Sequence, residues 1–566
     1  MRPQPDYLWR GWKTVGAVLL LLVVVSFIPP VTIGGITLRR ANIFADLYSF
    51  DDSHSTDTNT EVVLFDEEEF AVDLEAVSQQ IEADTTHHEI ERSYEWILAE
   101  ELPDREPITF DSRRYASGKT PIEDFSADGR FASFCDTLIK ANRTVRIAVL
   151  GDSFIEGDIL TADLRERLQA AFGGRGTGFA PMASPLTAYR RTVKTLSKGW
   201  TTYNVMQHKS TPEAYKGQFF VSGWVCRPTN GASTHWSATD YRNRLDSCST
   251  ARVLLLSPSK SRVELIVNDS LSREFSIEGA EGVRQLMVQA PAIHSLEFRV
   301  KEGAETMVAY GAMFEHCGVE VDNYSIRSNN GQAIFRTNPA INAQVNSLVG
   351  YDLVILQYGL NIMQQGVLNY ENYGTQIEKI VAYVRECFPS AAVLVLSVSD
   401  RAVKNESGVE SMDAIPAMID CQRTAARNCG AAFWSTYDAM RAEGGIEQFV
   451  SKGWAGKDYT HINYAGGRRV AWALFDAINA EAIEADERER RRIEQSRLLA
   501  MPAVAEQPLF EGVSVPEAVA PLTPEQPTEE PTAHEAEPSA VAEDATSEAV
   551  TVAATETSTP EAETAE

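Results

Sequence analysis

The sequence predicts an α/β fold built on a mostly parallel sheet, with helices on both faces and an inserted β-rich module. Two observations predict the sheet: over residues 145–172, and again over 351–482, short apolar runs rich in β-branched residues alternate with segments of helical periodicity. A third observation predicts the insert. Between about residues 198 and 315 the helical periodicity disappears, and short β-like runs separated by turn residues follow at a spacing typical of a β-sandwich.

The N-terminal residues predict a membrane anchor. Residues 14–36 are almost wholly apolar and long enough to span a bilayer, and no convincing small-x-small cleavage site follows them. Three basic residues in the preceding segment, residues 1–13, favour a cytoplasmic N-terminus, although two arginines just after the apolar segment weaken that argument. We therefore expect a single-pass protein of the inner (cytoplasmic) membrane, with its catalytic domain in the periplasm.

The chain between this anchor and its C-terminal helix divides by composition. Residues 37–107 are polar and strongly acidic, which indicates a juxtamembrane spacer with some helix over residues 89–102. The first part of the α/β domain then spans residues 108–197. The inserted β-sandwich module spans residues 198–315, and the second part of the α/β domain spans residues 316–482.

The first strand of the sheet, residues 145–150, ends at a Gly-Asp-Ser triplet, residues 151–153, where the glycine permits a sharp turn. A helix over residues 122–141 is expected before this strand. After it, apolar residues recur every four positions over residues 159–172 and predict a helix. Ser153 therefore follows a buried strand and precedes a helix, which is where open α/β sheets carry their reactive groups.

The second part of the domain repeats the same alternation of strands and helices. Its strands and helices are expected, in chain order, at residues 351–358 (strand), 377–384 (helix), 392–398 (strand), 415–428 (helix), 431–434 (strand) and 464–482 (helix). Residues 483–566 begin as a mixed-charge helix extension. They continue as an acidic tail rich in Ala, Glu, Pro and Thr, which has too little apolar surface to fold and is expected to be disordered.

Composition excludes several classes of function. The formal net charge of −29 leaves no basic stripe for nucleic acid. The seven cysteines include no CxxC pair, and the His87-His88 pair lacks further ligands at metal-binding spacing. The glycine-rich segment 173–178 lacks the Lys-Ser/Thr of a phosphate-binding loop. The sequence therefore predicts neither a metal site nor an organic cofactor.

Nucleophilic chemistry at Ser153 requires a base, and Asp458 and His461 supply a candidate just before the last helix. A neutral imidazole can take the serine proton, while an aspartate three residues earlier holds the other ring nitrogen. A tetrahedral intermediate also requires hydrogen-bond donors. Asn361, after the strand that ends near Gly359, can supply a side-chain amide, with the Ser153 backbone N–H as a second donor.

A third donor can come from Ser328-Asn329-Asn330-Gly331, which follows the β-module, although these are also ordinary turn residues. Taken in order, the pieces resemble the SGNH (GDSL-type) hydrolase family. Block I of that family matches Gly151-Asp152-Ser153, block III matches Gly359 and Asn361, and block V matches Asp458 and His461.

The resemblance implies a three-layer α/β/α fold with a Ser-His-Asp triad formed by Ser153, His461 and Asp458. It also implies an oxyanion hole made by Ser153, Asn361 and a block II residue, with supporting roles for Asp152 and Gly359. Block II usually has glycine where Ser328 aligns, so either Ser328 or Gly331 is the donor. Block III usually continues with Asp or Glu, whereas Ile362 follows Asn361. Neither departure removes a catalytic group.

A closer resemblance is to envelope peptidoglycan O-acetylesterases, through the run that begins Gly-Asp-Ser-Phe-Ile-Glu-Gly-Asp, the β-module between blocks I and II, and Gln357-Tyr358-Gly359. In that group the inserted module is similar to carbohydrate-binding modules. The implied reaction is removal of O-acetyl groups from a cell-envelope glycan, so the expected partners are an acetylated polysaccharide and the inner membrane. Two alternatives remain: a glycan O-acetyltransferase that uses the same serine, and a non-catalytic glycan-binding envelope protein.

Overall fold

A computed structural model describes residues 31–33, 36–38, 72–85, 92–108, 120–140, 143–405 and 408–500. The predicted anchor, residues 14–36, lies outside the described residues apart from its last few positions, where β1 (Val31–Ile33) pairs with β2 (Ile36–Leu38). The predicted tail beyond residue 500 also lies outside them. Within the described ranges, no helix has the length and apolar character needed to cross a membrane.

The chain forms two units, Met1–Leu498 and Leu499–Glu566, and the first contains the candidate site. A six-stranded sheet, counted over the described residues, lies at its centre, and all its strands are parallel except the last. In spatial order the strands are β15 (Val319–Ser325), β5 (Val145–Gly151), β16 (Leu353–Gln357), β17 (Ala392–Leu396), β20 (Ala432–Trp434) and the antiparallel β4 (Glu123–Asp124). This confirms the predicted parallel α/β sheet.

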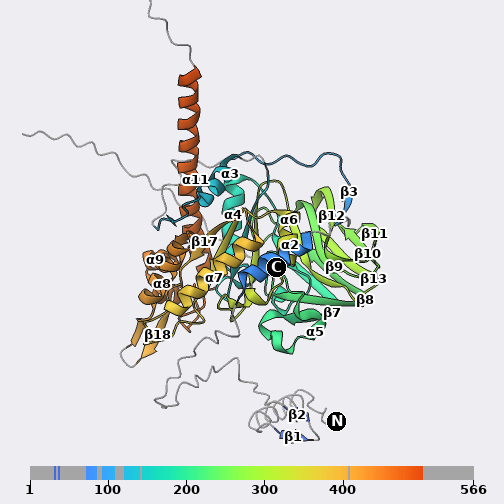
Figure 1. Cartoon of the computed structure of the whole chain (residues 1–566), viewed down its shortest axis with the longest axis horizontal. Helices are drawn as coiled ribbons and strands as arrows, with labels where there is room; N and C mark the ends of the chain where they lie inside the picture. Colours follow the sequence, from blue (N-terminus) through green and yellow to red (C-terminus); the bar gives the residue numbers. More distant parts are fainter. Residues whose placement is uncertain are drawn as a thin grey trace, which may run out of the picture. The chain divides into compact units, whose positions relative to one another are not determined.

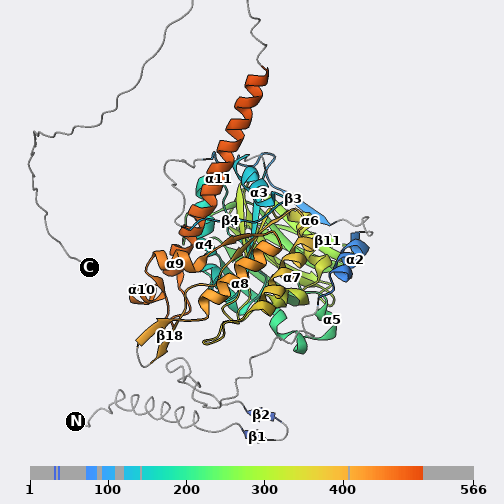
Figure 2. The ribbon, with the colours of Figure 1, turned by 60° about the vertical axis from the view of Figure 1, so that its left-hand side comes forward.

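Helices cover both faces of this sheet (Figures 1 and 2). On one face lie α6 (Pro339–Val349), α7 (Glu371–Cys387) and α8 (Ile415–Asn428), with α2 (Leu74–Thr85) packed on α6 and α7. On the other lie α3 (Arg130–Lys140), α4 (Thr161–Phe172) and α11 (Tyr464–Ala500). The guanidinium of Arg167 on α4 stacks 4.3 Å from the ring centre of Trp472 on α11. Because both faces are covered, every residue of β5, β16 and β17 is buried.

The inserted module is β-rich, as predicted, but its strands are linked by hydrogen bonds into one sheet of ten strands within the described ranges, not into the two separate sheets of a sandwich. The strands are β7 (Lys194–Asn204), β8 (Trp224–Ser237), β9 (Cys248–Ser257), β10 (Ser261–Val267), β11 (Leu271–Ile277), β12 (Ala280–Ile293), β13 (Ser295–Glu302), β14 (Val308–Glu315), β6 (Gly178–Pro181) and β3 (Ser93–Ile97). The sheet therefore starts before residue 198 and recruits a strand from the predicted spacer.

The helix predicted over residues 89–102 is wrong. β3 occupies part of that segment and pairs in parallel with β12. Trp96 is buried against the core of the module, and Tyr94 packs beside it, so tertiary contacts with two aromatic side chains select a strand. The helix predicted over residues 122–141 begins only at Arg130, because residues 123–124 pair with β20.

The remaining elements are short and complete the surface of the first unit. They are α5 (Glu213–Lys216), α9 (Thr436–Ala442), α10 (Gly445–Ser451), and the hairpin of β18 (Ala402–Asn405) and β19 (Gly408–Ser411). α11 continues without a break through the predicted charged extension, although its buried residues end at Ala485.

A buried ion pair joins the module to the parallel sheet. Arg146 on β5 contacts Glu315, the last residue of β14, and its Nη1 lies 3.1 Å from Asp322 on β15. Asp322 also accepts a 2.7 Å hydrogen bond from the backbone N–H of Phe179 on β6. All three ion-pair side chains are at most 6% exposed, so the two β-structures share a polar contact that is closed to solvent.

Candidate active site

Ser153 lies in a tight turn directly after β5, at the carboxyl edge of the parallel sheet. A Cβ atom at Gly151 would stand 2.9 Å from the carbonyl oxygen of Gln357, so only glycine fits where the chain leaves the strand. The Phe154 N–H donates a 2.9 Å hydrogen bond to Asp152 Oδ1, which closes the turn. The hydroxyl of Ser153 is thereby presented above the strand end.

The structure brings His461 and Asp458 to this serine from more than 300 residues along the chain. Ser153 Oγ lies 3.2 Å from His461 Nε2, and His461 Nδ1 lies 2.7 Å from Asp458 Oδ2. An Nδ1–H that donates to the carboxylate leaves Nε2 able to accept the serine proton, which is the tautomer a general base requires. Asp458 Oδ1 also accepts the His461 N–H at 3.1 Å, which fixes the aspartate on its own loop.

The start of α11 holds this loop in place. A Cβ atom at Gly467 would stand 2.0 Å from the carbonyl oxygen of Ile159, so the helix start lies directly against the chain that follows Ser153. The Tyr464 hydroxyl donates a 2.5 Å hydrogen bond to the carbonyl of Gly157 in the same segment. Two independent contacts therefore set the distance between the imidazole and the serine.

The electrostatics of the pair follow from its exposure and its partners. The hydrogen bond from His461 lowers the pKa of Asp458 to about 2, and the same bond raises the pKa of His461. The guanidinium of Arg327 opposes that second shift by lowering the pKa of His461. The side chains of His461 and Asp458 are 56% and 52% exposed, so the imidazole stands in contact with solvent.

Asn361 follows β16 at the same sheet edge, and its amide links two of the predicted blocks. Asn361 Nδ2 donates to Asp152 Oδ2 and to the carbonyl of Asn329, each at 3.0 Å. Gly359 precedes it with φ +116°, and a Cβ atom there would stand 2.7 Å from the Val398 side chain. The Asn361 amide therefore lies beside the serine turn, with both of its protons donated to protein oxygens.

The two candidates for the block II donor differ in the structure. The Gly331 N–H already donates a 2.9 Å hydrogen bond to Asn329 Oδ1. The Ser328 N–H makes no hydrogen bond within the described part of the chain. Ser328 has φ +61°, a left-handed conformation that glycine adopts most readily, which agrees with the family's usual residue there. Of the two, Ser328 has the N–H that can still donate to a ligand.

Asp152 is fully buried, and burial raises its pKa to about 7. Sequence reasoning assigned it only a supporting role, and it did not single out Asn329 or Arg327. The structure gives each of them a contact at the site: Asn329 through Asn361, and Arg327 through a hydrogen bond of 3.2 Å from its Nε to Glu156, three residues after Ser153. No spacing in the sequence marks these contacts, because each depends on how a loop folds back. Over the described residues, no three His, Cys, Asp or Glu side chains are grouped so that they could hold a metal ion.

A comparison with solved structures supports the fold. The structure is similar to one described as "Peptidoglycan O-acetylesterase in action, 5 min", with a TM-score of 0.52 and 23% identity over 64% of this chain and 99% of that chain. The chain has an SGNH-type (GDSL-like) hydrolase fold. Two further structures match with lower TM-scores. They are a family two carbohydrate esterase from Cellvibrio japonicus (TM-score 0.22, 8% identity, 51% of this chain, 99% of the other) and the acetyl xylan esterase AlAXEase (TM-score 0.22, 17% identity, 28% of this chain, 81% of the other).

No protein-family model and no curated protein matches the chain by sequence. The SGNH-type fold accounts for the parallel sheet. It also accounts for the way that Ser153 in the first block and His461 in the last block lie at the same edge of that sheet. It does not by itself assign a substrate. The chemistry of the site therefore has to come from the side chains at that edge.

Proposed function

We propose that this protein is a serine carbohydrate esterase that removes O-acetyl groups from a cell-envelope glycan, with peptidoglycan as the substrate. The observation that carries the proposal is the row of contacts from Ser153 Oγ through the His461 ring to Asp458, at 3.2 and 2.7 Å. A hydroxyl, a base and an orienting carboxylate in this order are the parts that acyl transfer requires. The SGNH-type fold supports the same class of reaction.

In the first half-reaction, Ser153 Oγ attacks the acetyl carbonyl carbon while its proton moves to His461 Nε2. Asp458 accepts the hydrogen bond from Nδ1–H and stabilises the imidazolium that forms. When the tetrahedral intermediate collapses, the bond from carbon to the sugar oxygen breaks. The leaving sugar oxygen takes the proton from Nε2, and the acetyl group remains on the serine.

The negative charge on the acetyl oxygen is stabilised by the backbone N–H groups of Ser153 and Ser328 and by the amide of Asn361. In the structure the Asn361 amide donates to the Asn329 carbonyl and to Asp152. An oxyanion is a stronger acceptor than a neutral carbonyl. We therefore expect the bond to Asn329 to be exchanged for one to the oxyanion as charge develops.

In the second half-reaction, water attacks the acetyl-serine, His461 takes one water proton, and acetate leaves as the proton returns to Ser153. The exposure of the His461–Asp458 pair favours water as the acceptor. An O-acetyltransferase has to keep water away from its acyl-enzyme while a sugar hydroxyl arrives. This exposure supports the proposal of an esterase over a transferase.

The cellular setting is part of the proposal. Residues 14–36 have the length and composition of an inner-membrane anchor, which would hold the catalytic domain in the periplasm beside a wall polymer. The fold likeness to a structure described as a peptidoglycan O-acetylesterase supports that polymer over others.

The test is acetate release from O-acetylated peptidoglycan, compared with O-acetylated xylan, by the wild type and Ser153→Ala. We expect release from peptidoglycan by the wild type and none by the variant, with an unchanged circular dichroism spectrum. Accumulation of acetylated acceptor in place of acetate would identify a transferase. Equal turnover by Ser153→Ala would refute the serine mechanism, and glycan binding without any turnover would leave the non-catalytic alternative.

A further inference from the structure

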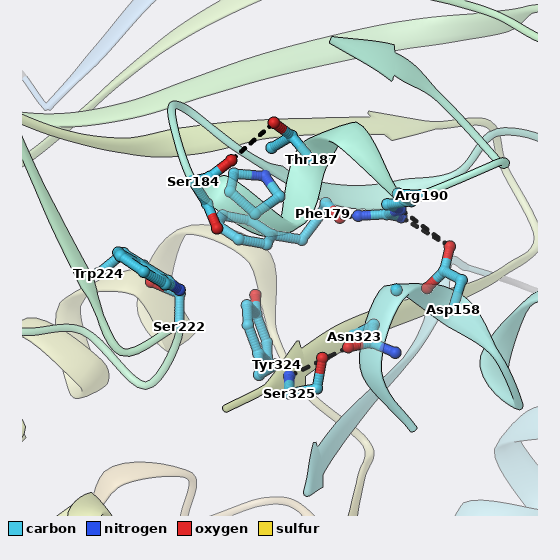
Figure 3. A pocket seen from close by; sticks show the side chains of 12 residues that line it. Asp158, Phe179, Ser184, Thr187, Arg190, Ser222, Trp224, Asn323, Tyr324 and Ser325 are labelled. Atoms are coloured by element: carbon cyan, nitrogen blue, oxygen red, sulfur yellow. Dashed lines mark hydrogen bonds and ion pairs between the residues drawn. The ribbon is translucent and has the colours of Figure 1, made fainter. Parts of the chain in front are cut away.

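A small pocket opens where the β-module meets the carboxyl end of β15, one strand away from the strand that carries Ser153. Its walls come from β6, the start of β8, the end of β15 and the segment after Ser153, and Figure 3 shows them facing one another. Ser325 in its lining is in register with Gly151, two residues before Ser153. Ser153, His461 and Asn361 all lie outside the lining. The pocket therefore adjoins the candidate site but cannot hold the ester that is cleaved.

The charged side chains of the pocket lining are paired inside the protein. Its two charged residues, Asp158 and Arg190, pair with each other at 2.9 Å and are both buried (Figure 3). Asp158 also pairs with Arg165 at 3.1 Å. Arg190 also donates to the carbonyls of Phe179 and Thr177, at 2.5 and 3.0 Å. Because both charged side chains of the lining bind groups inside the protein, the pocket suits an uncharged ligand group better than an ionic one.

The rest of the lining combines apolar surface with a buried hydroxyl that has no hydrogen-bond partner within the described residues. Phe179, Trp224 and Tyr324 supply ring surface around the space. Ser222 lies beside Trp224, is 4% exposed, and its Oγ has no hydrogen-bond partner within the described residues. A buried hydroxyl left unpaired costs free energy, and a ligand atom that bonds to it recovers that loss. The single Cα–Cβ torsion of serine can turn this hydroxyl towards a ligand in the pocket.

We infer that this pocket binds the acetamido group of an N-acetylated sugar, next to the sugar position whose ester is cleaved. An acetamido group is uncharged, carries a methyl for the aromatic walls, and has a carbonyl and an N–H that a serine hydroxyl can meet. This inference rests on the proposed function and deepens it. It makes the enzyme selective for glycans of N-acetylhexosamines over acetylated polymers of plain sugars, through Ser222 and Trp224.

The kinetic test compares three substrates: O-acetylated oligomers of N-acetylglucosamine, O-acetylated xylo-oligosaccharides, and a small acetyl ester. We expect Ser222→Ala to lower kcat/KM about fivefold on the first substrate only, and Ser222→Leu, which fills the pocket, to lower it further. Thr436→Val is the matched control, because it removes another buried, unpartnered hydroxyl, on α9. It should leave the ratio between substrates unchanged. Loss of rate on all three substrates alike, or on none, would overturn the inference.

A binding test separates this inference from the proposed function. Calorimetry with Ser153→Ala protein should detect binding of the N-acetylglucosamine disaccharide and not of cellobiose, and adding Ser222→Leu should abolish the signal. If Ser222→Leu does not fold, Ser222→Ala should weaken the same binding. If the Ser222 variants bind the disaccharide as tightly as the Ser153→Ala protein does, the pocket is excluded as the binding site, even if the protein is an active esterase. If the wild type releases no acetate but binds the disaccharide through Ser222, the inference about the pocket holds and the proposed reaction is refuted.

Discussion

Two groups of opposite charge act on the pKa of His461, and this pKa sets the pH range in which the ring can act as a base. Asp458 raises the pKa of His461 above its ordinary value of 6.5, and Arg327 pulls it back down. Only the neutral imidazole accepts the Ser153 proton, so activity should fall as pH falls through the His461 pKa. The acid limb of kcat/KM should therefore lie above pH 6.5.

Replacing Arg327 tests this balance. Arg327→Gln removes a cation that disfavours the imidazolium, so the pKa of His461 should rise and the acid limb should move to higher pH. Arg327→Lys keeps the charge and serves as the control, with a limb close to that of the wild type. The measurement is the pH profile of kcat/KM on a small acetyl ester. If the acid limb of the kcat/KM profile lies at the same pH in Arg327→Gln as in the wild type, the guanidinium does not change the pKa of His461.

Asn361 is the residue whose role depends most on the transition state. Its amide donates to two protein oxygens in the structure, and the proposed mechanism has it donate to the oxyanion as charge develops. Asn361→Ala should therefore lower kcat by about 10²–10³-fold with little change in KM. Steady-state kinetics on the small ester measure both constants. A rise in KM at constant kcat would instead make Asn361 a binding residue.

The site residues that could be predicted are those that lie next to a recognisable strand end or helix start in the sequence. The serine turn and the Asp-x-x-His pair were found because a strand end and a helix start lie beside them in the sequence. The choice between Ser328 and Gly331 could not be made that way, since both are turn residues. It depends on which backbone N–H Asn329 already engages, and only folded geometry determines that.

At the scale of elements, the first turn of α11 positions the loop that carries Asp458 and His461. Gly467→Ala places a methyl group where only 2.0 Å separates it from the Ile159 carbonyl, so the helix start must move. We expect a loss of about 1–3 kcal/mol in the free energy of unfolding and at least a tenfold fall in kcat/KM, because the imidazole moves with the helix. Urea unfolding and ester kinetics measure the two effects.

Gly217→Ala is the matched control for that substitution. A Cβ atom at Gly217 would meet nothing within 4 Å, and its φ of −87° suits any residue. It should change neither the unfolding free energy by more than about 0.5 kcal/mol nor the kinetics. Normal activity in Gly467→Ala would mean that the contact with Ile159 does not set the position of His461.

Strand β15 was not predicted from the sequence, and the composition of this strand explains why. β15 reads Val-Glu-Val-Asp-Asn-Tyr-Ser, and its polar residues Glu320, Asp322 and Asn323 are nevertheless buried. They are accommodated because Arg146 and neighbouring backbone groups pair with them. A hydrophobic pattern cannot reveal a strand whose inward positions are satisfied by ion pairs and hydrogen bonds formed elsewhere in the chain. Strands β16 and β17 were predicted because all their residues are apolar except Gln357, the last residue of β16.

For the whole molecule, Arg146 makes a buried ionic contact between the module and the parallel sheet. Arg146→Met leaves Glu315 and Asp322 without their shared buried cation, which should lower the free energy of unfolding by about 3–5 kcal/mol. Arg143→Met is the control: its guanidinium is 53% exposed and pairs with Asp352, so its loss should cost about 1 kcal/mol or less. Urea unfolding followed by far-UV circular dichroism measures both. Equal effects of the two substitutions would contradict this role for Arg146.

The half-exposed imidazole has a consequence for how a long substrate is used. A reaction centre at the bottom of a closed tunnel admits a polymer only by its end, and its rate then depends on the number of chain ends. Here the base and its carboxylate lie on an open rim. If the proposed function is correct, a glycan chain can bind across such a rim anywhere along its length, and the enzyme can deacetylate the interior of an intact, cross-linked network.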